Sequence, residues 1–445
     1  MRENLLAALR TGQDAFPGII GFGQTVLPQL ERAIIAGHDV ILLGERGQGK
    51  TRLIRTLTLL LDEWTPVVAG CEINDHPYAP VCARCVRLSG ELGDDLPITW
   101  RRRDERYGEK LATPDTSVGD LVGDIDPVKV AEGRTLSDPE TIHFGLVPRT
   151  NRGIFCLNEL PDLAERIQVS LLNVLEERDI SVRGYSLRLP LDLVLVASAN
   201  PEDYTNRGRI ITPLKDRFGA EIRTHYPVSL EAELALIHQE AQLSWGGASA
   251  PGAIMPEHLV QVLARFTRLV RASPAVDSRS GVSARFAIAA AEAVAASAVR
   301  RAAISGEDQP VARVCDLPAT ITTLRGKVEF EVSEEGREQE VLDHLLRRAT
   351  AETFRATLGS ADLSGLLTRF AEGGAVETSD LLAATDLLHR IGEVPGLAKV
   401  MERLHMDGGE SFGEAAAALE FAMEGLYLMR RLSKDVLDGG AVYRT

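Results

Sequence analysis

The sequence of 445 residues lacks the long apolar run that a membrane span requires. Its most apolar helical stretch, Ala284–Val299, is interrupted by Arg285 and Glu292, and the N-terminus has neither a long apolar segment nor a cleavage site. Five cysteines are too few for a disulfide scaffold in a chain of this length. We therefore expect a cytoplasmic protein that makes no membrane contact.

The chain also lacks a basic excess and several catalytic motifs. Its formal net charge of −15 argues against nucleic-acid binding, because phosphate neutralisation requires Lys and Arg. Neither the His-Glu-x-x-His pattern of metalloproteases nor the Gly-x-Ser-x-Gly pattern of serine hydrolases is present. No repeat or low-complexity linker divides the sequence, whose length suggests about two or three domains.

Short apolar runs, each followed by glycine or a polar turn residue, predict a parallel sheet in the first half of the chain. The predicted strands are Val40–Leu43, Val67–Gly70, Ile154–Leu157, Leu193–Ser198 and Glu221–Arg223. A helix is expected after Pro161, because apolar residues recur at Ile167, Leu171, Val174 and Leu175, and a hairpin is expected over Ile180–Leu189. From Ser229 onward the pattern is almost wholly helical, apart from a short strand-like stretch at Gly326–Val332. Ser229 can cap a helix that runs through Gln242, Pro256 opens a second helix, and Ser283 opens a third.

The segment from Gly44 to Thr51 fits the Gly-x4-Gly-Lys-Thr pattern of a nucleotide phosphate-binding loop. An apolar strand precedes it and the helical run Arg52–Leu61 follows it, so a chance glycine-rich turn is the weaker alternative. Glycines let backbone N–H groups converge on phosphate, and the helix N-terminus adds partial positive charge. We expect Lys50 to contact the β- and γ-phosphates and Thr51 to bind Mg²⁺. The predicted loop residues are Gly44, Glu45, Arg46, Gly47, Gln48, Gly49, Lys50 and Thr51.

ATP hydrolysis also needs an acidic residue at the end of a second buried strand, and Ile154–Leu157 is followed by Asn158 and Glu159. We expect Glu159 to polarise the attacking water and to help hold Mg²⁺. Asn158 stands where an Asp is usual, and it can accept a hydrogen bond from a Mg²⁺-bound water but carries no charge. A carboxylate at this position would attract the metal ion, and the attraction between two unit charges is about 4 kcal/mol at 4 Å and an effective dielectric of about 20. Asn158 does not provide this attraction. Nucleotide binding without turnover is therefore the alternative.

A third polar residue, Asn200, comes directly after the strand Leu193–Ser198. An Asn at the end of a buried strand beside the phosphate loop can position water against the γ-phosphate. An ordinary Asn-Pro turn is the alternative, because Pro201 follows.

These segments, in this order, resemble the AAA+ ATPases, in particular the clade of the magnesium-chelatase I subunit and the MoxR-like ATPases. Phe16–Gln24 resembles the family's opening segment, whose backbone borders the adenine, and this implies that Ile20 and Gly21 bind nucleotide. The stretch from Leu121 to Gly153 resembles the clade's insertion in the second core helix. The predicted hairpin resembles the one before the first sensor, and Asn200 matches that sensor.

The resemblance, which covers Phe16 to Arg300, also implies functional roles for two arginines. Leu214–Phe218 is similar to the arginine-finger motif and implies that Arg217 reaches the ATP of a neighbouring subunit, which requires a homo-oligomer, by resemblance a hexamer. The alternative is a surface arginine paired with Asp216. Arg285, which opens a helix after Ser283, resembles the second sensor, with an ordinary helix-start arginine as the alternative.

The resemblance implies an α/β fold, with a P-loop AAA+ parallel five-stranded sheet sandwiched by helices. The expected organisation is an N-terminal helix (1–15), the AAA+ core (16–228), a helical lid (229–302) and a mostly helical C-terminal region (303–445). The implied function is a ring ATPase of the MoxR or magnesium-chelatase type that uses ATP and Mg²⁺ to remodel or activate a partner protein, with a von Willebrand A-domain protein as the expected partner.

The sequence leaves three other functions as alternatives. The first is a magnesium-chelatase motor subunit that drives metal insertion into a porphyrin, and the second is a nucleotide-gated scaffold whose hydrolysis is impaired by Asn158. The third, an enhancer-binding transcriptional activator, is disfavoured because the Gly-Ala-Phe-Thr-Gly-Ala loop of that group is absent.

A separate cluster of metal-ligand residues lies within fifteen residues of the chain, at Cys71, His76, Cys82 and Cys85. Three Cys and one His match a closed structural zinc site, and Cys82-x2-Cys85 has the spacing of a metal knuckle. The overall spacing is not that of a standard zinc finger, so a loop with incidental cysteines is the alternative.

Overall fold

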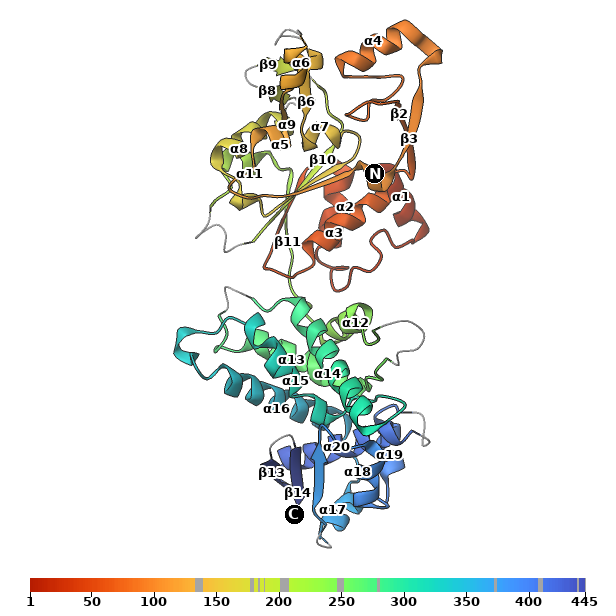
Figure 1. The fold of residues 1–445 in the computed structure, drawn as a ribbon, viewed down its shortest axis with the longest axis vertical. Coiled ribbons are helices and arrows are strands. Elements are labelled where there is room, and N and C mark those ends of the chain that lie inside the picture. The colour runs from red at the N-terminus through yellow and green to blue at the C-terminus, as the bar shows by residue number, and fades with distance from the viewer. Residues whose placement is uncertain are drawn as a thin grey trace. The chain divides into compact units, whose positions relative to one another are not determined.

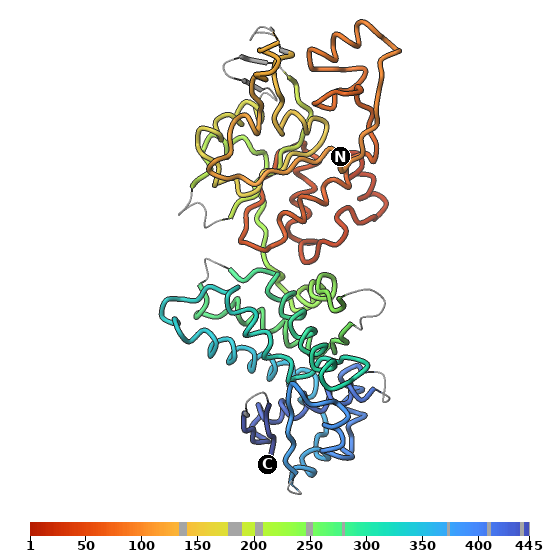
Figure 2. Tube along the Cα trace, in the orientation of Figure 1, coloured from red at the N-terminus to blue at the C-terminus, as the bar shows by residue number. Residues whose placement is uncertain are grey.

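The computed structural model describes residues 1–132, 139–176, 180–182, 185–187, 189–200, 208–245, 252–277, 281–371, 374–406, 411–437 and 440–444. The chain forms two compact units, Met1–Tyr226 and Pro227–Thr445 (Figure 1). It passes from the first unit to the second once, after Tyr226, as the trace in Figure 2 shows. The boundaries expected for a lid and a separate C-terminal region stay predictions.

The first unit is built on a parallel five-stranded sheet with the order β11-β1-β10-β7-β4, which confirms the expected fold class. Successive side chains of a strand point to opposite faces, so each face has its own apolar cluster. On one face Leu42 and Val196 pack with Leu30 and Leu53, and on the other Ile41 packs with residues of later helices. The strands are β1 Val40–Leu43, β4 Tyr107–Leu111, β7 Ile154–Asn158, β10 Val194–Ala199 and β11 Ala220–Arg223.

Short helices cover both faces of this sheet (Figure 1). The helices on the face of Leu42 are α1 Arg2–Thr11, α2 Leu27–Ala36, α3 Lys50–Thr56 and the 3-10 turn η1 Leu57–Leu60. Those on the opposite face include the 3-10 turn η5 Leu160–Asp162, α8 Glu165–Ser170, α9 Leu172–Glu176 and α11 Thr212–Arg217. The single helix expected after Pro161 is therefore broken into three pieces, although its four periodic apolar residues are all buried.

One predicted core strand is wrong. The stretch Val67–Gly70 overlaps β2 Trp64–Val68, which pairs antiparallel with β3 Ile98–Arg102 in a ribbon outside the main sheet. The fifth core strand is instead β4, whose sequence Tyr-Gly-Glu-Lys-Leu is half-buried at the sheet edge. An edge strand needs no continuous apolar run, so the apolar pattern could not reveal it.

Two insertions accompany the core of the first unit. One lies between β2 and β4 and holds α4 Ala83–Leu92 with the turns η2 Gly93–Asp95 and η3 Arg103–Arg106. The other holds a small antiparallel hairpin of β5 Gly123–Ile125 and β6 Ile142–Phe144, with α5 Val118–Leu121, α6 Pro127–Ala131, η4 Pro139–Thr141 and α7 Leu146–Arg149. The expected hairpin is confirmed as β8 Ile180–Val182 paired with β9 Tyr185–Leu187, while Arg183 and Gly184 at its tip lie outside the described residues.

The second unit is mainly helical and encloses one large apolar cluster. Its first three helices begin after Ser229, Pro256 and Ser283, as the sequence predicts, and Ser229 Oγ accepts a hydrogen bond from the Ala232 amide at 3.1 Å. The helices are α12 Leu230–Glu240, α13 Glu257–Ala272, α14 Ala284–Ser305, α15 Ala319–Leu324, α16 Glu338–Thr357, α17 Ser364–Ala371, α18 Ala384–Ile391, α19 Leu397–Arg403 and α20 Phe412–Leu428, with the turn η6 Val314–Asp316.

The strand content of the second unit differs from the expectation. The strand-like stretch Gly326–Val332 is not a strand. It begins within the 3-10 turn η7 Arg325–Lys327 and ends at the start of the turn η8 Val332–Glu334, and Phe330 forms one isolated bridge with Val276. An antiparallel sheet of order β12-β14-β13 was not predicted, and it consists of β12 Val376–Ser379, β13 Ser433–Leu437 and β14 Gly440–Arg444. Among the described residues no helix has both the length and the apolarity to cross a membrane.

A buried histidine gives the second unit a pH-dependent stability. The ring of His258 on α13 packs 4.5 Å from the ring of Phe421 on α20, and neither of its nitrogens has a hydrogen-bond partner in the described structure. Burial lowers the pKa of His258 to about 3. Below about pH 6.5, the usual histidine pKa, the unfolded chain therefore binds a proton that the folded chain does not.

We predict that the free energy of unfolding falls as the pH is lowered from about 6.5, by up to about 1.4 kcal/mol per pH unit from this group. Denaturant unfolding of the full chain between pH 7 and pH 5 measures the slope. The His258→Phe variant, which keeps an aromatic ring against Phe421, should show a shallower slope. Equal slopes in the two proteins would contradict the assignment.

Candidate functional site

The phosphate-binding loop lies between the end of β1 and the start of α3, as the sequence predicts. Gly47 and Gly49 have φ values of 72° and 80°, a left-handed conformation that glycine adopts without strain. Gly49 is the N-cap of α3 and has no side chain, so the first N–H groups of the helix are available to phosphate oxygens. Lys50 and Thr51 open this helix.

Two residues that the sequence did not reveal hold the loop in place. The Thr224 hydroxyl donates to Gln48 Oε1 at 2.6 Å, and the Thr224 amide donates to the Leu43 carbonyl at 2.7 Å. The Tyr226 hydroxyl donates to the Arg46 carbonyl at 2.8 Å. A Cβ on Gly44 would lie 2.0 Å from Thr224 Oγ1, so this approach also explains the first glycine of the pattern. The sequence offered one indication of these roles, which is that Thr224 and Tyr226 directly follow β11, the strand that pairs with β1.

A chain of hydrogen bonds joins the loop to the two other strands of the predicted site. Lys50 is buried, and its Nζ donates to the Glu45 carbonyl at 2.9 Å, to the Gly44 carbonyl, and to Asn200 Oδ1 at 2.7 Å. Asn200 Nδ2 in turn donates to Glu159 Oε2 at 2.6 Å. The structure therefore brings Lys50, Asn200 and Glu159 together, although they are far apart in the sequence.

Glu159 has an uncommon backbone conformation for a residue with a side chain. Its φ and ψ are 56° and 48°, in the left-handed region, and its amide donates to Ser198 Oγ at 3.3 Å. A non-glycine residue in this region costs about 1–3 kcal/mol and is often found at functional sites. The half-buried carboxylate is thereby directed from the end of β7 toward Asn200.

Asn158 is buried beside a carboxylate that the sequence analysis missed. Its Nδ2 donates to Glu109 Oε1 at 2.7 Å, and its Oδ1 accepts from Ser198 Oγ at 3.0 Å. Arg55 on α3 forms two hydrogen bonds to the Glu109 carboxylate, at 3.0 and 3.2 Å. Burial opposes ionisation of Glu109, but the hydrogen bonds from Arg55, Tyr107 and Asn158 outweigh it and lower its pKa. Glu109 escaped notice because it lies on the unpredicted edge strand β4.

The opening segment approaches the same loop. Gly21 has a φ of 81°, and the ring of Phe22 meets the ring of His225 edge-on at 5.2 Å. His225 lies between the two residues that hold the phosphate loop, so the predicted adenine-bordering pair Ile20 and Gly21 is placed on that side of the site. A pocket of 330 Å³ adjoins the loop, and its lining residues are Leu43, Gly44, Glu45, Gln48, Lys215, Arg223 and Thr224.

The two predicted arginines lie at the end of α11 and at the start of α14. Arg217, at the end of α11, forms an ion pair with Glu176 of α9, with Arg217 Nη2 and Nε 2.6 and 2.8 Å from Glu176 Oε2. Its partner is thus Glu176, whereas the alternative interpretation named Asp216. Arg285 is exposed in the first turn of α14, in the second unit.

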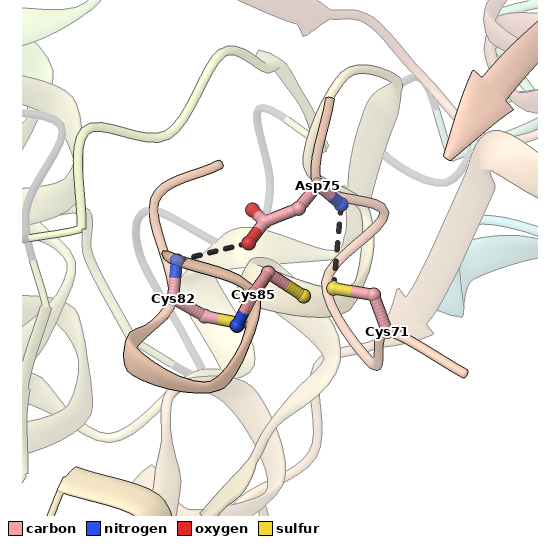
Figure 3. A group of neighbouring side chains, drawn as sticks. All are labelled: Cys71, Asp75, Cys82 and Cys85. Atoms are coloured by element: carbon pink, nitrogen blue, oxygen red, sulfur yellow. Dashed lines mark hydrogen bonds between the residues drawn. The ribbon is translucent and has the colours of Figure 1, made fainter. Parts of the chain in front are cut away.

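A second group of side chains lies in the insertion between β2 and β4, on the loop after β2 and at the start of α4. The ligand atoms of Cys71, Asp75, Cys82 and Cys85 all lie within 4.8 Å of one another, and all four residues are buried. Figure 3 shows the Cys71 and Cys85 sulfurs facing each other. His76 is not a member of this group, and its Nδ1 accepts a hydrogen bond from the Tyr78 amide at 3.1 Å. The predicted Cys/His set is therefore corrected to three Cys and one Asp.

Parts of the chain are similar to known proteins. The family model described as "Sigma-54 interaction domain" matches residues 135–217. The magnesium-chelatase subunit ChlI of Nostoc sp. is 30% identical over 51% of this chain and 58% of its own length. ChlI of Synechocystis sp. is 32% identical over 50% of this chain and 61% of its own length. The magnesium-chelatase 38 kDa subunit of Acidiphilium rubrum is 31% identical over 45% of this chain and 55% of its own length.

Two solved structures also show similarity to this chain. NtrX from Brucella abortus in complex with ATP is 14% identical, with a TM-score of 0.42 over 90% of this chain and 72% of that chain. A complex of magnesium-chelatase subunits BchI and BchD is 21% identical, with a TM-score of 0.36 over 72% of this chain and 98% of that chain.

The strand order, the phosphate loop after β1 and the carboxylate after β7 define a P-loop domain of the AAA+ class. Within this class the chain is similar in sequence to magnesium-chelatase I subunits, which confirms that part of the resemblance, whereas the MoxR-like part stays a prediction. The chain spans little more than half of the length of the curated relatives named above.

The contact between Asn158 and Glu109 predicts the effect of restoring the usual acidic residue. The Asn158→Asp variant removes the amide donor and places a second carboxylate against Glu109, which should lower the free energy of unfolding by about 1–3 kcal/mol. Thermal unfolding of the nucleotide-free protein measures the loss. In the double variant with Glu109→Gln the amide again faces a carboxylate, so most of the stability should return. An additive double variant would contradict the pairing.

Proposed function

We propose that this chain hydrolyses ATP as a subunit of a homo-oligomeric ring and uses the energy to remodel or activate a partner protein. The observation that carries the proposal is the hydrogen-bond chain from Lys50 through Asn200 to Glu159. It links a phosphate-binding cation, a polar residue that can orient water, and a carboxylate that can accept a proton. These are the protein groups that phosphoryl transfer to water requires.

Each residue has a defined task in this proposal. The N–H groups at the start of α3 and the Lys50 ammonium bind the β- and γ-phosphates, and Lys50 exchanges the Gly44 and Glu45 carbonyls for phosphate oxygens. Asn200 orients the attacking water, and Glu159 accepts its proton. Thr51 and Glu159 are the residues that would hold Mg²⁺, which neutralises charge on the phosphates when bound.

The uncharged Asn158 argues for slow turnover. Its amide is already bonded to Glu109, and that carboxylate is balanced by Arg55. The negative charge next to the metal position therefore comes mainly from Glu159. A nucleotide-gated scaffold with impaired hydrolysis is the competing function that this feature favours.

The ring is proposed because Arg217 resembles an arginine finger, which acts on the nucleotide of a neighbouring subunit. Its partners in the described structure, Glu176 and the Pro213 carbonyl, belong to its own helix and to α9. In a ring we propose that it leaves Glu176 and contacts the γ-phosphate bound by the neighbouring subunit, where an arginine finger contributes about 10³–10⁵ in rate. A hexamer, a von Willebrand A-domain partner and a cytoplasmic location are proposed from the family resemblance alone, as is the sensor role of Arg285.

The relatives named as magnesium-chelatase subunits favour a second candidate, a motor that drives magnesium insertion into a porphyrin. The chain shares with them the ATPase core, and a porphyrin would enter through a separate partner. Co-purification from the native host distinguishes the two: a tetrapyrrole-binding partner supports the chelatase motor, and a partner without a tetrapyrrole supports general remodelling.

The role of Glu159 is tested by the Glu159→Gln variant. The amide oxygen of the substituted side chain can still accept the hydrogen bond from Asn200, so ATP should bind with nearly unchanged affinity. Hydrolysis should fall by about 10²–10⁴-fold, because an amide cannot accept the proton of the attacking water. Phosphate release with Mg²⁺, at a protein concentration that permits assembly, measures the rate, and equilibrium binding measures the affinity.

Glu165→Gln is the matched control, because Glu165 is exposed in the first turn of the next helix, α8. It should hydrolyse ATP at the parent rate. A Glu159→Gln protein that is as active as this control would remove Glu159 from the mechanism. A parent protein that binds ATP but releases no phosphate would support the scaffold instead.

Arg217→Ala tests the ring. We predict loss of turnover with ATP affinity nearly unchanged, whereas Arg166→Ala, at an exposed arginine of α8, should leave turnover intact. Mixing inactive Arg217→Ala subunits with inactive Glu159→Gln subunits should restore activity, because some interfaces then combine Glu159 of one chain with Arg217 of the next. No recovery on mixing, in samples shown to form mixed rings, would contradict a finger that acts between subunits.

A further inference from the structure

We propose that Cys71, Asp75, Cys82 and Cys85 form a closed structural site for one Zn²⁺ ion in the first unit. The proposed ATPase mechanism uses none of these residues. Their four ligand atoms lie within 4.8 Å of one another (Figure 3). Around a tetrahedral zinc with Zn–S distances of about 2.3 Å the sulfurs are roughly 3.8 Å apart, so only a small contraction is needed.

The Asp75 carboxylate is the feature that points to a cation. Asp75 is 1% exposed, and its Oδ2 accepts from the Cys82 amide at 2.9 Å. Its Oδ1 is buried and has no hydrogen-bond partner within the described part of the chain. A buried carboxylate oxygen without a partner is costly unless it is neutralised or coordinates a metal. A metal ion among the three sulfurs would supply that partner.

The surroundings of the sulfurs suit metal-bound thiolates. The Asp75 amide donates to Cys71 Sγ, and the Cys85 amide donates to Cys82 Sγ, both at 3.4 Å. Backbone N–H groups directed at sulfur stabilise its negative charge. Cys82 is also the N-cap of the ten-residue helix α4, where partial positive charge favours an anion. Arg84 Nη1 lies 3.9 Å from Cys85 Sγ.

The ligand set identifies the kind of metal. Three thiolates favour borderline-soft Zn²⁺ over hard Mg²⁺ or Ca²⁺, and a carboxylate oxygen is a common fourth zinc ligand. Four protein ligands complete a tetrahedron and leave no position for water or substrate, which is the arrangement of a structural site. The cysteines support this, because all three are buried.

The site would fasten an irregular loop to the nucleotide-binding core. Between β2 and α4 the segment 69–82 contains no helix or strand. Its Ile73 carbonyl accepts from Asn151 Nδ2 at 3.0 Å, and Asn74 Nδ2 donates to the Arg149 carbonyl at 2.8 Å. Those partners immediately precede β7, the strand that ends at Asn158. A zinc ion would thus hold the loop against the root of this strand, and its removal should lower stability before it affects chemistry.

The first experiment uses the unaltered full chain, expressed in zinc-supplemented medium and purified without chelator. Elemental analysis should find about one equivalent of zinc per chain. Alkylation of the native protein should leave Cys71, Cys82 and Cys85 unmodified until zinc is removed, and should modify them afterwards. Less than about a tenth of an equivalent, before and after addition of ZnCl₂, would overturn the proposal. So would a disulfide between any two of the three cysteines in the native protein, detected by intact mass.

Variants then test whether the fourth zinc ligand is Asp75 or the adjacent His76. Asp75→Ala should reduce bound zinc at least tenfold after dialysis against a weak competing chelator, and so should Cys85→Ser. His76→Ala should retain zinc, because that ring faces Tyr78. Cys315→Ser, at a cysteine in the second unit, is the matched thiol control and should also retain it. Loss of zinc in His76→Ala with retention in Asp75→Ala would overturn the proposed ligand set.

A variant that fails to fold is replaced by a measurement on the parent protein. Cobalt exchanged into the site should give the sulfur-to-cobalt charge-transfer and visible bands of a tetrahedral thiolate centre. Thermal unfolding should occur at a lower temperature after zinc removal and recover on its return. Octahedral cobalt spectra, or unfolding that does not respond to zinc, would overturn the proposal. ATP hydrolysis is measured separately, so a failure of either proposal leaves the other to stand or fall by its own test.

Discussion

The parallel alignment of β1, β10 and β7 is the constraint on which the candidate site depends. Leu43 pairs with Ala199, and Ala197 pairs with Leu157, so the three strands end at the same edge of the sheet. Only this register lets Asn200 bridge Lys50 and Glu159 through bonds of 2.7 and 2.6 Å. A slip of one residue in any of the three strands would turn its side chains to the opposite face and break the chain. The two apolar clusters stabilise the register from both faces.

The charges at this edge are arranged around an asparagine. Asn158 occupies the place of a carboxylate, and the nearest carboxylate, Glu109, comes from the neighbouring strand β4. Arg55 neutralises Glu109 from the helix that begins with Lys50. The arrangement keeps the end of β7 close to neutral in the absence of nucleotide. The same arrangement leaves Glu159 as the principal anion facing Lys50 and Asn200, and this is the physical basis of the slow turnover proposed above.

Local patterns predicted the parts of the molecule that depend on neighbouring residues in the chain. Spacing and residue type determine the phosphate loop, the strand before Glu159 and the helix starts at Ser229 and Ser283. The sequence therefore predicted all of them. The misses are contacts across the fold. Thr224 and Glu109 acquire their roles only through strand pairing, and β4 is too polar to be recognised as a core strand. Likewise, the sequence does not indicate that Asp75 faces the three cysteines and that the adjacent His76 does not.

If Arg217 acts on the ATP of a neighbouring subunit, as proposed above, its ion pair with Glu176 is the contact that assembly has to replace. Arg217 and Glu176 are 29% and 58% exposed, and pairs with this exposure contribute only about 0–1 kcal/mol. The pair is therefore strong enough to limit the conformations of the side chain but weak enough to be exchanged. A γ-phosphate carries more charge than one carboxylate and would be less exposed between subunits, so the exchange favours the assembled state. On this argument nucleotide binding itself would promote ring formation, because ATP supplies the anion for which Arg217 leaves Glu176.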